Sequence, residues 1–470
     1  MLRKIVAYLP STVVPILLNF ALVFIYAGCM APSEYGVYSV YLNSISLIYA
    51  VALSFLQSAA LRFYSMEGMY KDFREYYSTY IFANLAICAA LAVVLLLANL
   101  AFHFNWVVIT FAVLSNALYQ FDVNLCRLRD DVGQYTLCRL TASIGALALT
   151  IACVVLTGTL SYTVPIYTFY GAFLFTIVTE FVRCLKDLSI KHVSKRLLSE
   201  SFRFGMPMAG VTVAGLLVAY SSQYLIIWLL SEEAVGFYSL GFRLSDSVIS
   251  NITMVILTVM TPTVMKAYDN AGADGFTRGS AMLKRLINLD TWIVVPCCLL
   301  LALYSGDIIR LLFPSYVGAE AVVVAMVFSA VLRSLSMIAC KGLELARRTG
   351  RMLACLVASL VVNVVYSAAF IPVYGITAAA HASVAAYLTY DVLLVVQSRR
   401  YVPVCFDWIY LAKVGLASLA MGVACLAIKG ATMVGDVVVL IVQGTLCVLV
   451  YLGASCLLGL HKGFGDSGAD

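Results

Sequence analysis

The sequence contains fourteen long apolar runs, separated from one another by charged and turn-forming residues. A membrane-spanning helix needs about 20 mainly apolar residues, which is the length of these runs. Hydrophobic residues make up 63% of the 470-residue chain and charged residues only 11%, unlike soluble domains. The sequence therefore predicts an all-α polytopic membrane protein with spans near residues 8–30, 37–61, 78–98, 104–126, 135–157, 162–183, 203–230, 237–265, 286–305, 319–341, 352–372, 375–397, 408–428 and 434–459.

Basic residues are distributed unevenly between the two sets of connections that alternate along the chain. One set contains 24 of the 30 Lys and Arg residues, and the other contains only Arg310 and Lys429. The remaining four lie within the apolar runs: Arg139, Arg243, Arg333 and Lys413. Because basic residues accumulate in cytoplasmic loops, both termini are predicted to be cytoplasmic. The net charge of +6 then follows from topology, and we expect no nucleic-acid partner.

Two stretches that lie 200 residues apart are nearly the same. Residues 32–41 are PSEYGVYSVY and residues 231–240 are SEEAVGFYSL, so Gly36 and Gly236 have matching surroundings. The longest basic linker follows the sixth run, which means that two six-helix repeats would cross the membrane in the same direction. We therefore predict two parallel lobes at 1–190 and 203–400, a cytoplasmic linker at 191–202, and two further spans with a cytoplasmic tail at 401–470. Gly36 and Gly236 are expected in equivalent outer turns.

Five stretches together resemble the polysaccharide transporters of the multidrug, oligosaccharidyl-lipid and polysaccharide (MOP) exporter superfamily, particularly the Wzx-type flippases. They are PSEYGVYS at 32–39, RFGMP at 203–207, EAVGFYSLGFRL at 233–244, LFPSYVGA at 312–319 and IPVYGITAAAHAS at 371–383. Their order and spacing cover about 400 residues. The resemblance supplies no invariant catalytic motif, so the expected roles of individual residues come from physical chemistry.

The resemblance implies a two-lobed fold like that of the multidrug (MATE) exporters of the same superfamily. It also implies flipping of an undecaprenyl-pyrophosphate-linked oligosaccharide by alternating access, from the cytoplasmic to the periplasmic leaflet of the bacterial inner membrane. Such units build O-antigen and lipopolysaccharide, capsule or exopolysaccharide. The implied partners are this lipid-linked substrate, the bilayer, a polysaccharide polymerase and a chain-length regulator.

Arginines within the apolar runs are the main candidates for substrate binding. A charge inside a span costs about 2.5–3.5 kcal/mol on insertion scales, so such a residue faces a watery cavity or pairs with a partner. Arg333 is the deepest, and Arg243 precedes Asp246 by three residues, either as a structural ion pair or as part of a cavity. Arg139 and Arg62 either face the lumen or extend to the headgroups. A guanidinium can hold a pyrophosphate through two hydrogen bonds, which suits the implied substrate.

Polar residues in the middle of two apolar runs are candidates for contact with the glycan. Tyr220 and Gln223 belong to a polar girdle in the run at 203–230, and Asn19 lies at a comparable depth in the first run. Such residues can equally form hydrogen bonds between helices. The glycines of the two repeated stretches, Gly36 and Gly236, are expected at an outer gate.

Carboxylates within the runs are candidates for coupling transport to an ion. Asp246 and Asp391 are the candidates for H⁺ or Na⁺, whereas Glu180 and Asp290 are expected to pair with an arginine or lie near the headgroups. No cofactor is expected. The fourteen cysteines lie mostly inside apolar runs and the four histidines are scattered, so no metal site is expected either.

Two other functions are open at this point. A multidrug exporter of the same superfamily would use acidic and aromatic residues for cationic drugs, and the buried arginines argue against it. A polytopic polysaccharide polymerase or ligase would need a large outer loop, but the longest outer connection, 306–318, contains one Arg. No nucleophile stands beside a base, so we do not expect an enzyme.

Overall fold

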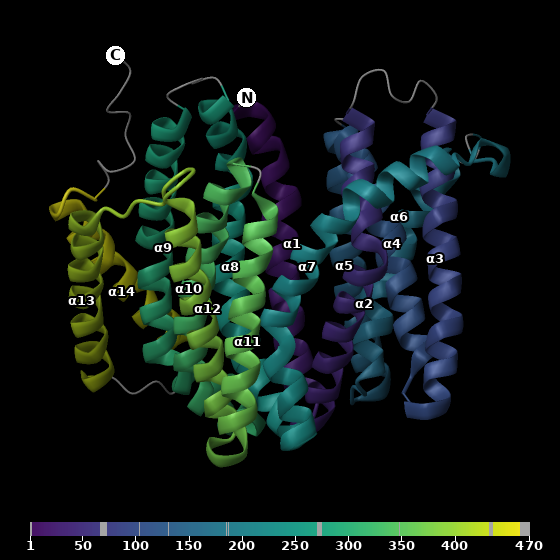
Figure 1. Cartoon of the computed structure of the whole chain (residues 1–470). Coiled ribbons are helices and arrows are strands. Elements are labelled where there is room, and N and C mark those ends of the chain that lie inside the picture. The colour runs from purple at the N-terminus through teal and green to yellow at the C-terminus, as the bar shows by residue number, and fades with distance from the viewer. Residues whose placement is uncertain are drawn as a thin grey trace. The chain divides into compact units, whose positions relative to one another are not determined.

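The structure is a computed structural model that describes residues 2–65, 73–102, 104–129, 131–184, 186, 188–269, 275–346, 348–431 and 436–460. These residues form α-helices connected by short segments (Figure 1). The first lobe contains α1 (Leu2–Cys29), α2 (Pro32–Ser65), α3 (Phe73–Phe102), α4 (Trp106–Leu128), α5 (Val132–Thr157), α6 (Thr163–Cys184) and the 3₁₀ helix η2 (Ile190–His192). The helices that follow are α7 (Lys195–Leu229), α8 (Glu232–Asp269), α9 (Gly275–Leu312), η4 (Pro314–Ala319), α10 (Glu320–Leu345), α11 (Thr349–Tyr374), α12 (Ile376–Ser398), α13 (Trp408–Ala431) and α14 (Val437–Leu457).

The length and composition of these helices confirm the predicted membrane fold. Twelve helices in the described part of the chain are long and apolar enough to cross a bilayer. Shorter apolar stretches occupy Val13–Cys29 of α1 and Thr163–Thr179 of α6. Helices satisfy their backbone hydrogen bonds internally, which is required of any segment in lipid. The chain is a multi-pass membrane protein.

Local sequence explains several helix ends. Asp131 caps α5, because its side-chain Oδ1 accepts a hydrogen bond from the backbone N–H of Gln134 at 3.0 Å. Gly158 ends the same helix with a φ of 72°, a left-handed conformation that favours glycine. Gly375, with a φ of 63°, separates α11 from α12 with a single residue. These end signals keep the connections short, so neighbouring helices are antiparallel.

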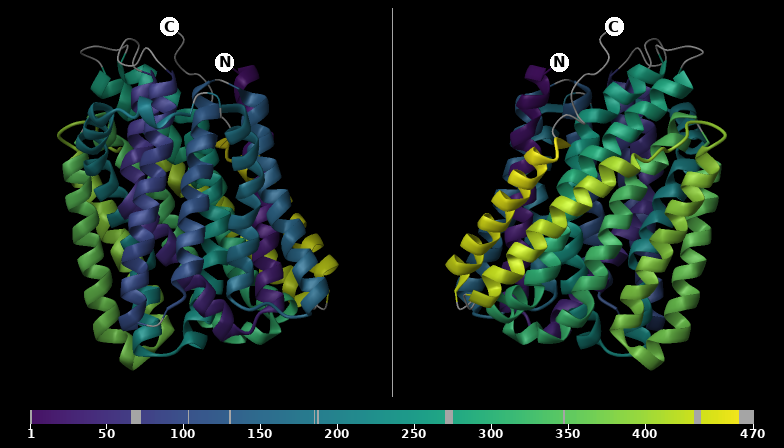
Figure 2. Two further views of the ribbon diagram at one scale, coloured as in Figure 1. Left: turned by 90° about the vertical axis from the view of Figure 1, so that its right-hand side faces the viewer. Right: turned by 90° about the vertical axis from the view of Figure 1, so that its left-hand side faces the viewer.

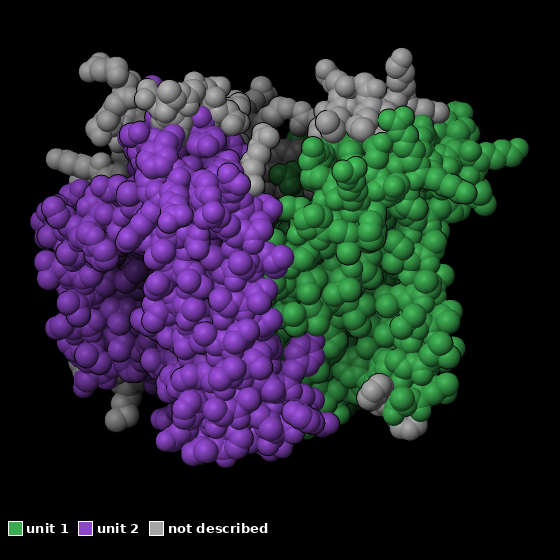
Figure 3. Space-filling model, viewed as in Figure 1, with its two compact units in different colours: residues 1–220 green, residues 221–470 purple. Residues whose placement is uncertain are grey.

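The chain divides into two compact units, Met1–Tyr220 and Ser221–Asp470 (Figure 3). Within the first unit α4 packs against α2, α3, α5 and α6. Within the second unit α10 packs against α8, α9, α11 and α12. The helix pairs α5 with α6 and α11 with α12 also correspond. These packing pairs of unit 1 recur six helices later in unit 2, as expected for the six-helix repeat that the sequence predicts.

Helices α13 and α14 form an additional pair on the second unit. They pack against each other and against α9, as the two yellow helices of Figure 2 illustrate. The indole Nε1 of Trp292 on α9 donates a hydrogen bond to Ser455 Oγ on α14 at 2.7 Å. The Tyr451 hydroxyl of α14 donates to the Trp292 carbonyl at 2.7 Å. The two added helices are therefore attached to α9 through polar as well as apolar contacts.

Helix α7 contributes to both units, because the boundary between the units falls after Tyr220. It begins at Lys195, eight residues before the predicted start, so most of the expected linker at 191–202 is helical. Its first part packs in unit 1, where Ser201 Oγ and Tyr80 Oη lie 2.8 Å apart. Only the last nine residues of α7 belong to unit 2. Residues 461–470, which make up most of the predicted cytoplasmic tail, lie outside the described residues.

Candidate functional site

The candidate site in unit 2 is centred on a short segment of α10, residues 333–336, which we call the α10 polar segment. Arg333 lies near the middle of the helix, and its Nη1 is 2.7 Å from Oδ1 of Asp246 on α8. The side chains are 26% and 22% exposed, so this ion pair is half-buried. Ser250, one turn further along α8, donates a hydrogen bond to the same carboxylate oxygen at 2.6 Å. The α10 polar segment therefore binds α8 through a charged contact.

The next residue of the α10 polar segment contacts a second carboxylate. Ser334 Oγ donates a hydrogen bond to Oδ2 of Asp290 on α9. Thr253 of α8 donates to Oδ1 of Asp290 at 2.7 Å, and the Thr253 and Ser334 hydroxyl oxygens are 2.8 Å apart. Asp290 is 3% exposed, so this group is buried among three helices. The sequence placed Asp290 beside an arginine or near the headgroups, but the structure surrounds it with hydroxyls.

A third carboxylate contacts the end of the same segment. Ser336 Oγ donates a hydrogen bond to Oδ1 of Asp391 on α12 at 2.6 Å. The other oxygen, Oδ2, is buried and has no hydrogen-bond partner among the described residues. Four consecutive residues of α10 thus include contacts to three neighbouring helices. The sequence signal for this arrangement was the pair of serines that accompany the arginine in the stretch LRSLSM.

The polar girdle of α7 takes part in hydrogen bonds between helices. Ser221 and Ser222 both donate to Oδ1 of Asn363 on α11, at 3.1 and 3.0 Å. Ser239 of α8 donates to Oε1 of Gln223 at 3.2 Å, and Gln223 is 2% exposed. Of the two roles considered for this girdle, these contacts favour interhelical bonding for Gln223 in this conformation. Asn363 was not identified from the sequence, because a single Asn in an apolar run gives no indication of its partners.

The candidates in unit 1 lie on different helices. Arg62 is exposed near the end of α2, with its guanidinium carbon 4.1 Å from the centroid of the Phe204 ring. Arg139 is half-buried on α5, 5.9 Å from the Tyr135 ring centroid. Asn19 is exposed on α1. These residues form no single cluster through the contacts described.

The remaining candidates are half-buried. Tyr220 is the last residue of unit 1, within α7, and Arg243 lies on α8 three residues before Asp246. The ion pair described for Asp246 is with Arg333 of another helix. Among all the predicted site residues, the structure therefore brings together Arg333 and Asp246 most closely.

Gly36 and Gly236 lie inside helices, which corrects their expected placement in turns. They are buried residues in the first turns of α2 and α8, which begin at Pro32 and Glu232. The connections themselves are residues 30–31 and 230–231. A glycine on a buried helix face has no side chain and so leaves room for a neighbouring segment. The glycine of the G-x-Y-S pattern is therefore as compatible with a helix as with a turn. The two positions remain equivalent in the repeat.

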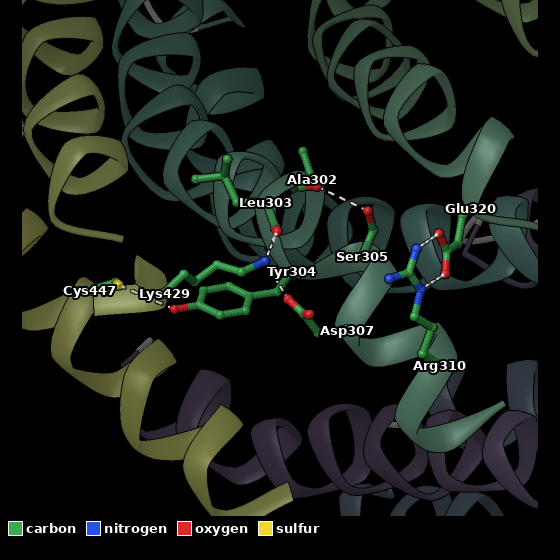
Figure 4. Close-up of polar contacts among 9 residues, drawn as sticks. All are labelled: Ala302, Leu303, Tyr304, Ser305, Asp307, Arg310, Glu320, Lys429 and Cys447. Carbon is green, nitrogen blue, oxygen red and sulfur yellow. Dashed lines mark hydrogen bonds and ion pairs between the residues drawn. The ribbon is translucent and has the colours of Figure 1, made fainter. Parts of the chain in front are cut away.

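Two ion pairs lie at the end of unit 2 where α9 ends and α10 begins (Figure 4). Arg310 Nε and Nη2 form two hydrogen bonds with Glu320, at 2.7 and 2.8 Å. Lys429 of α13 pairs with Asp307 of α9 and donates to the Leu303 carbonyl at 2.9 Å. Arg310 and Lys429 are the two basic residues that the sequence placed on the outer side. Both are neutralised by a carboxylate.

No group of three or more His, Cys, Asp or Glu side chains in the described part of the chain is arranged to hold a metal ion. The contacts of the α10 polar segment are instead hydroxyl–carboxylate bonds and one guanidinium–carboxylate pair. Such groups can bind anions through Arg333 and exchange protons through the carboxyls, but they present no nucleophile paired with a base.

Solved structures with the same fold include a flippase and multidrug transporters. The structure titled lipid II flippase MurJ, in an inward closed conformation, has a TM-score of 0.66 at 14% identity, covering 97% of this chain and 98% of that chain. An inward-facing multidrug resistance MATE family transporter of the MOP superfamily has a TM-score of 0.60 at 12% identity, covering 86% and 96%. A MOP superfamily transporter from Pyrococcus furiosus also reaches 0.60 at 13% identity, covering 88% and 96%.

These identities are low, so the likeness concerns the fold. A search of curated protein sequences found no match. The profile of one protein family, however, described as polysaccharide biosynthesis protein, matches residues 25–318. The match runs from the end of α1 to η4 and so includes both copies of the repeated stretch. With more than half of its residues in that match and a MOP-type fold around them, the chain belongs to the polysaccharide biosynthesis protein family.

Proposed function

We propose that this protein is a flippase for undecaprenyl-pyrophosphate-linked oligosaccharide repeat units. In this proposal it moves them by alternating access across the bacterial inner membrane for O-antigen, capsule or exopolysaccharide synthesis. Membership of a polysaccharide biosynthesis family supports a glycan substrate. A fold shared with a protein titled lipid II flippase supports transport of a lipid-linked molecule rather than catalysis. A polysaccharide polymerase and a chain-length regulator are the proposed partners that use the flipped unit.

The observation that carries the proposal is the half-exposed ion pair between Arg333 and Asp246. A guanidinium in the middle of a membrane helix is costly unless it is paired or hydrated. Asp246 provides that pairing. A pyrophosphate carries more negative charge than one carboxylate and can accept two hydrogen bonds from the guanidinium. We therefore propose that the substrate displaces Asp246 from Arg333.

If the substrate displaces Asp246 from Arg333, substitutions of these two residues should have different effects on export. The chain and its variants are expressed in a bacterium that lacks its own repeat-unit flippase, and surface polysaccharide is measured at equal protein level. Arg333→Ala should abolish the restored polysaccharide, and Arg243→Ala should reduce it if that residue shares the anion. Asp246→Asn keeps the guanidinium, so it should retain export. Export by Arg333→Ala at the wild-type level would refute the anion site.

Failure of the parent chain to restore polysaccharide would call for a test of the alternative function. Efflux of cationic drugs from the same strain would then support a multidrug exporter with the fold that the MATE transporters share. Equal loss of export in Arg333→Ala and Asp246→Asn, with less of both variants in the membrane than of the parent chain before expression is matched, would indicate that the ion pair is only structural. The first turns of α2 and α8, with Gly36 and Gly236, remain the proposed outer gate.

We propose a proton as the coupling ion and Asp391 as its binding residue. Asp391 is 4% exposed, and its only described hydrogen bond comes from a neutral hydroxyl, Ser336. Burying an unpaired carboxylate charge is costly, so the carboxyl would carry a proton in this conformation. Asp246 is the weaker candidate, because it is already paired with Arg333.

The coupling proposal predicts different effects at two buried carboxyls. Asp391→Asn should make transport in proteoliposomes independent of a pH gradient, and Asp290→Asn serves as the control because hydroxyls occupy both of its oxygens. A sodium gradient that drives transport without a pH gradient would contradict the proposal.

We propose that both termini face the cytoplasm, as the basic residues predict. Cys405 provides the test, because it is an exposed cysteine in the connection between α12 and α13. A membrane-impermeant thiol reagent should label it only after the inner membrane is permeabilised, and Cys405→Ser should remove that labelling. Labelling in cells with an intact inner membrane would indicate the opposite topology, with this connection on the outer side.

A further inference from the structure

Two arginines converge on one aromatic ring at the end of unit 2 where α10 ends and α11 begins. The guanidinium carbons of Arg348 and Arg351 are each 5.1 Å from the centroid of the Tyr401 ring. Arg351 also donates a hydrogen bond from Nη1 to Gln397 Oε1 at 3.0 Å. Arginine stacks well on aromatic faces, so the ring holds both cations in place.

Two further arginines immediately precede Tyr401 in the sequence and add to the positive charge. Arg399 and Arg400 are exposed residues that directly precede Tyr401. We refer to Arg348, Arg351, Arg399, Arg400 and Tyr401 as the Tyr401 arginine cluster. Four guanidinium groups attached to the ends of two adjacent helices produce a strong local positive potential.

Two of the described carboxylates at this end of unit 2 are paired with lysines. Lys341 Nζ lies 2.6 Å from Glu344 Oε2, and Lys284 Nζ lies 3.0 Å from Asp407 Oδ2. The described contacts give Arg348 and Arg351 only the amide and the ring as partners. The positive charge of the cluster is therefore left for an anion from outside the described chain.

Apolar stripes on the two helices begin below the cluster. Positions four residues apart lie on one face of a helix, and one such face of α11 and one of α12 are exposed. The stripe of α11 and the stripe of α12 consist of Val357, Val361, Val365, Leu388, Val392 and Val396. Valine and leucine at this exposure in a membrane helix provide a surface for acyl chains.

We propose that the Tyr401 arginine cluster binds the phosphate headgroup of an anionic phospholipid. Guanidinium groups match phosphate oxygens in geometry, and basic pockets at the cytoplasmic ends of membrane helices bind anionic lipid headgroups. The acyl chains lie along the apolar stripes of α11 and α12. This lipid site is independent of the proposed transport function and of the Arg333 anion site.

The test compares lipid binding by purified full-length protein and two double variants. Native mass spectrometry counts retained phosphatidylglycerol after exchange into phosphatidylcholine nanodiscs with increasing phosphatidylglycerol content. Arg348→Gln/Arg351→Gln should bind phosphatidylglycerol about 30-fold more weakly than the wild type. Lys191→Gln/Lys195→Gln removes the same charge from exposed positions of unit 1 and should bind as the wild type does. Equal weakening in both double variants would show diffuse charge attraction and overturn the site.

A further variant keeps the test informative if the arginine variant does not fold. Tyr401→Leu retains all four guanidiniums but removes the ring that holds two of them, so it should bind the lipid several-fold more weakly. Wild-type binding by Tyr401→Leu would contradict the role of the ring.

The source of the phosphate is tested with soluble pyrophosphate, which lacks acyl chains and should displace the lipid only weakly. Full displacement by pyrophosphate at equal phosphate concentration would overturn the assignment to a phospholipid.

Discussion

The replacement of Gly205 by alanine tests the tightest helix crossing in unit 1. Gly205 is in the RFGMP stretch of α7, where the helix passes the backbone of α2. A Cβ atom at this position would lie 2.1 Å from the Phe55 carbonyl oxygen, 2.7 Å from its carbon and 2.8 Å from its Cα. All three are backbone atoms, so no side-chain rotation relieves the overlap. The two helices would have to separate by about 1 Å to restore van der Waals contact.

The expected effect is the sum of two opposing terms. Overpacking of a well-packed interior costs about 1–3 kcal/mol, and a clash with backbone atoms belongs at the upper end. Alanine in place of a helical glycine contributes about 1 kcal/mol in the other direction. The separation would also loosen the buried cluster that α7 forms with α2 through Leu197 and Ala209. We therefore expect Gly205→Ala to destabilise the protein by about 2 kcal/mol.

A second glycine of the same helix supplies the matched control. A Cβ on Gly215 would meet nothing within 4 Å, so Gly215→Ala should leave stability unchanged or raise it by up to about 1 kcal/mol. Thermal unfolding of both variants in one detergent measures the difference. If Gly205→Ala melts at the same temperature as Gly215→Ala or above it, the close crossing of α2 and α7 is refuted.

Three further changes test other contacts by thermal unfolding. Arg333→Met leaves Asp246 without its ion pair and should lower the free energy of unfolding by about 1–3 kcal/mol, after allowing for partial exposure. The double variant Arg333→Met/Asp246→Leu should recover part of that loss. A double variant less stable than the single one would contradict this expectation. Trp292→Phe loses the indole bond to α14 and should cost about 1 kcal/mol, so an unchanged melting temperature would argue against that bond. The hydrogen bond from Lys284 lowers the pKa of the Asp407 carboxyl below its ordinary 3.8, so the bond stabilises the protein above that pH and is lost as the pH falls through the lowered pKa. Asp407→Asn should therefore melt below the wild type at pH 7, with a difference that shrinks below about pH 4; a difference independent of pH would count against the ion pair.

The sequence was sufficient for the helices and the repeat because both depend on patterns along the chain. Apolar length predicts a membrane helix directly, and the repeated stretches at Gly36 and Gly236 have equivalent places in α2 and α8. Their placement in turns was wrong, because the same glycine serves equally well on a buried helix face. The start of α7 at Lys195 was missed since its first turns are polar and contain four charged residues.

The partners of polar residues were less accessible from the sequence, because the rotation of a helix is not fixed by its composition. Asp246 was considered as a partner of Arg243, three residues away on the same helix, yet its described ion pair is with Arg333 on α10. Gln223 was considered both for the lumen and for bonding between helices, and its bond to Ser239 of α8 could not be read from the sequence. Nothing in the sequence around Asp290 indicated that hydroxyls from α8 and α10 would bond to its carboxylate.

The ion pairs at the end of unit 2 have a consequence for the insertion of this protein into the membrane. In the predicted orientation, Arg310 and Lys429 must cross the bilayer, which opposes the usual retention of basic residues in the cytoplasm. Arg310, in the last turn of α9, and Glu320, the first residue of α10, are only ten residues apart and flank one connection, so they can neutralise each other while that connection is translocated. Lys429 is separated from Asp307 by 122 residues and finds its partner only when α9 is already in place. In that orientation, the order of synthesis, α9 before α13, would provide each translocated cation with a carboxylate at the time when it is needed.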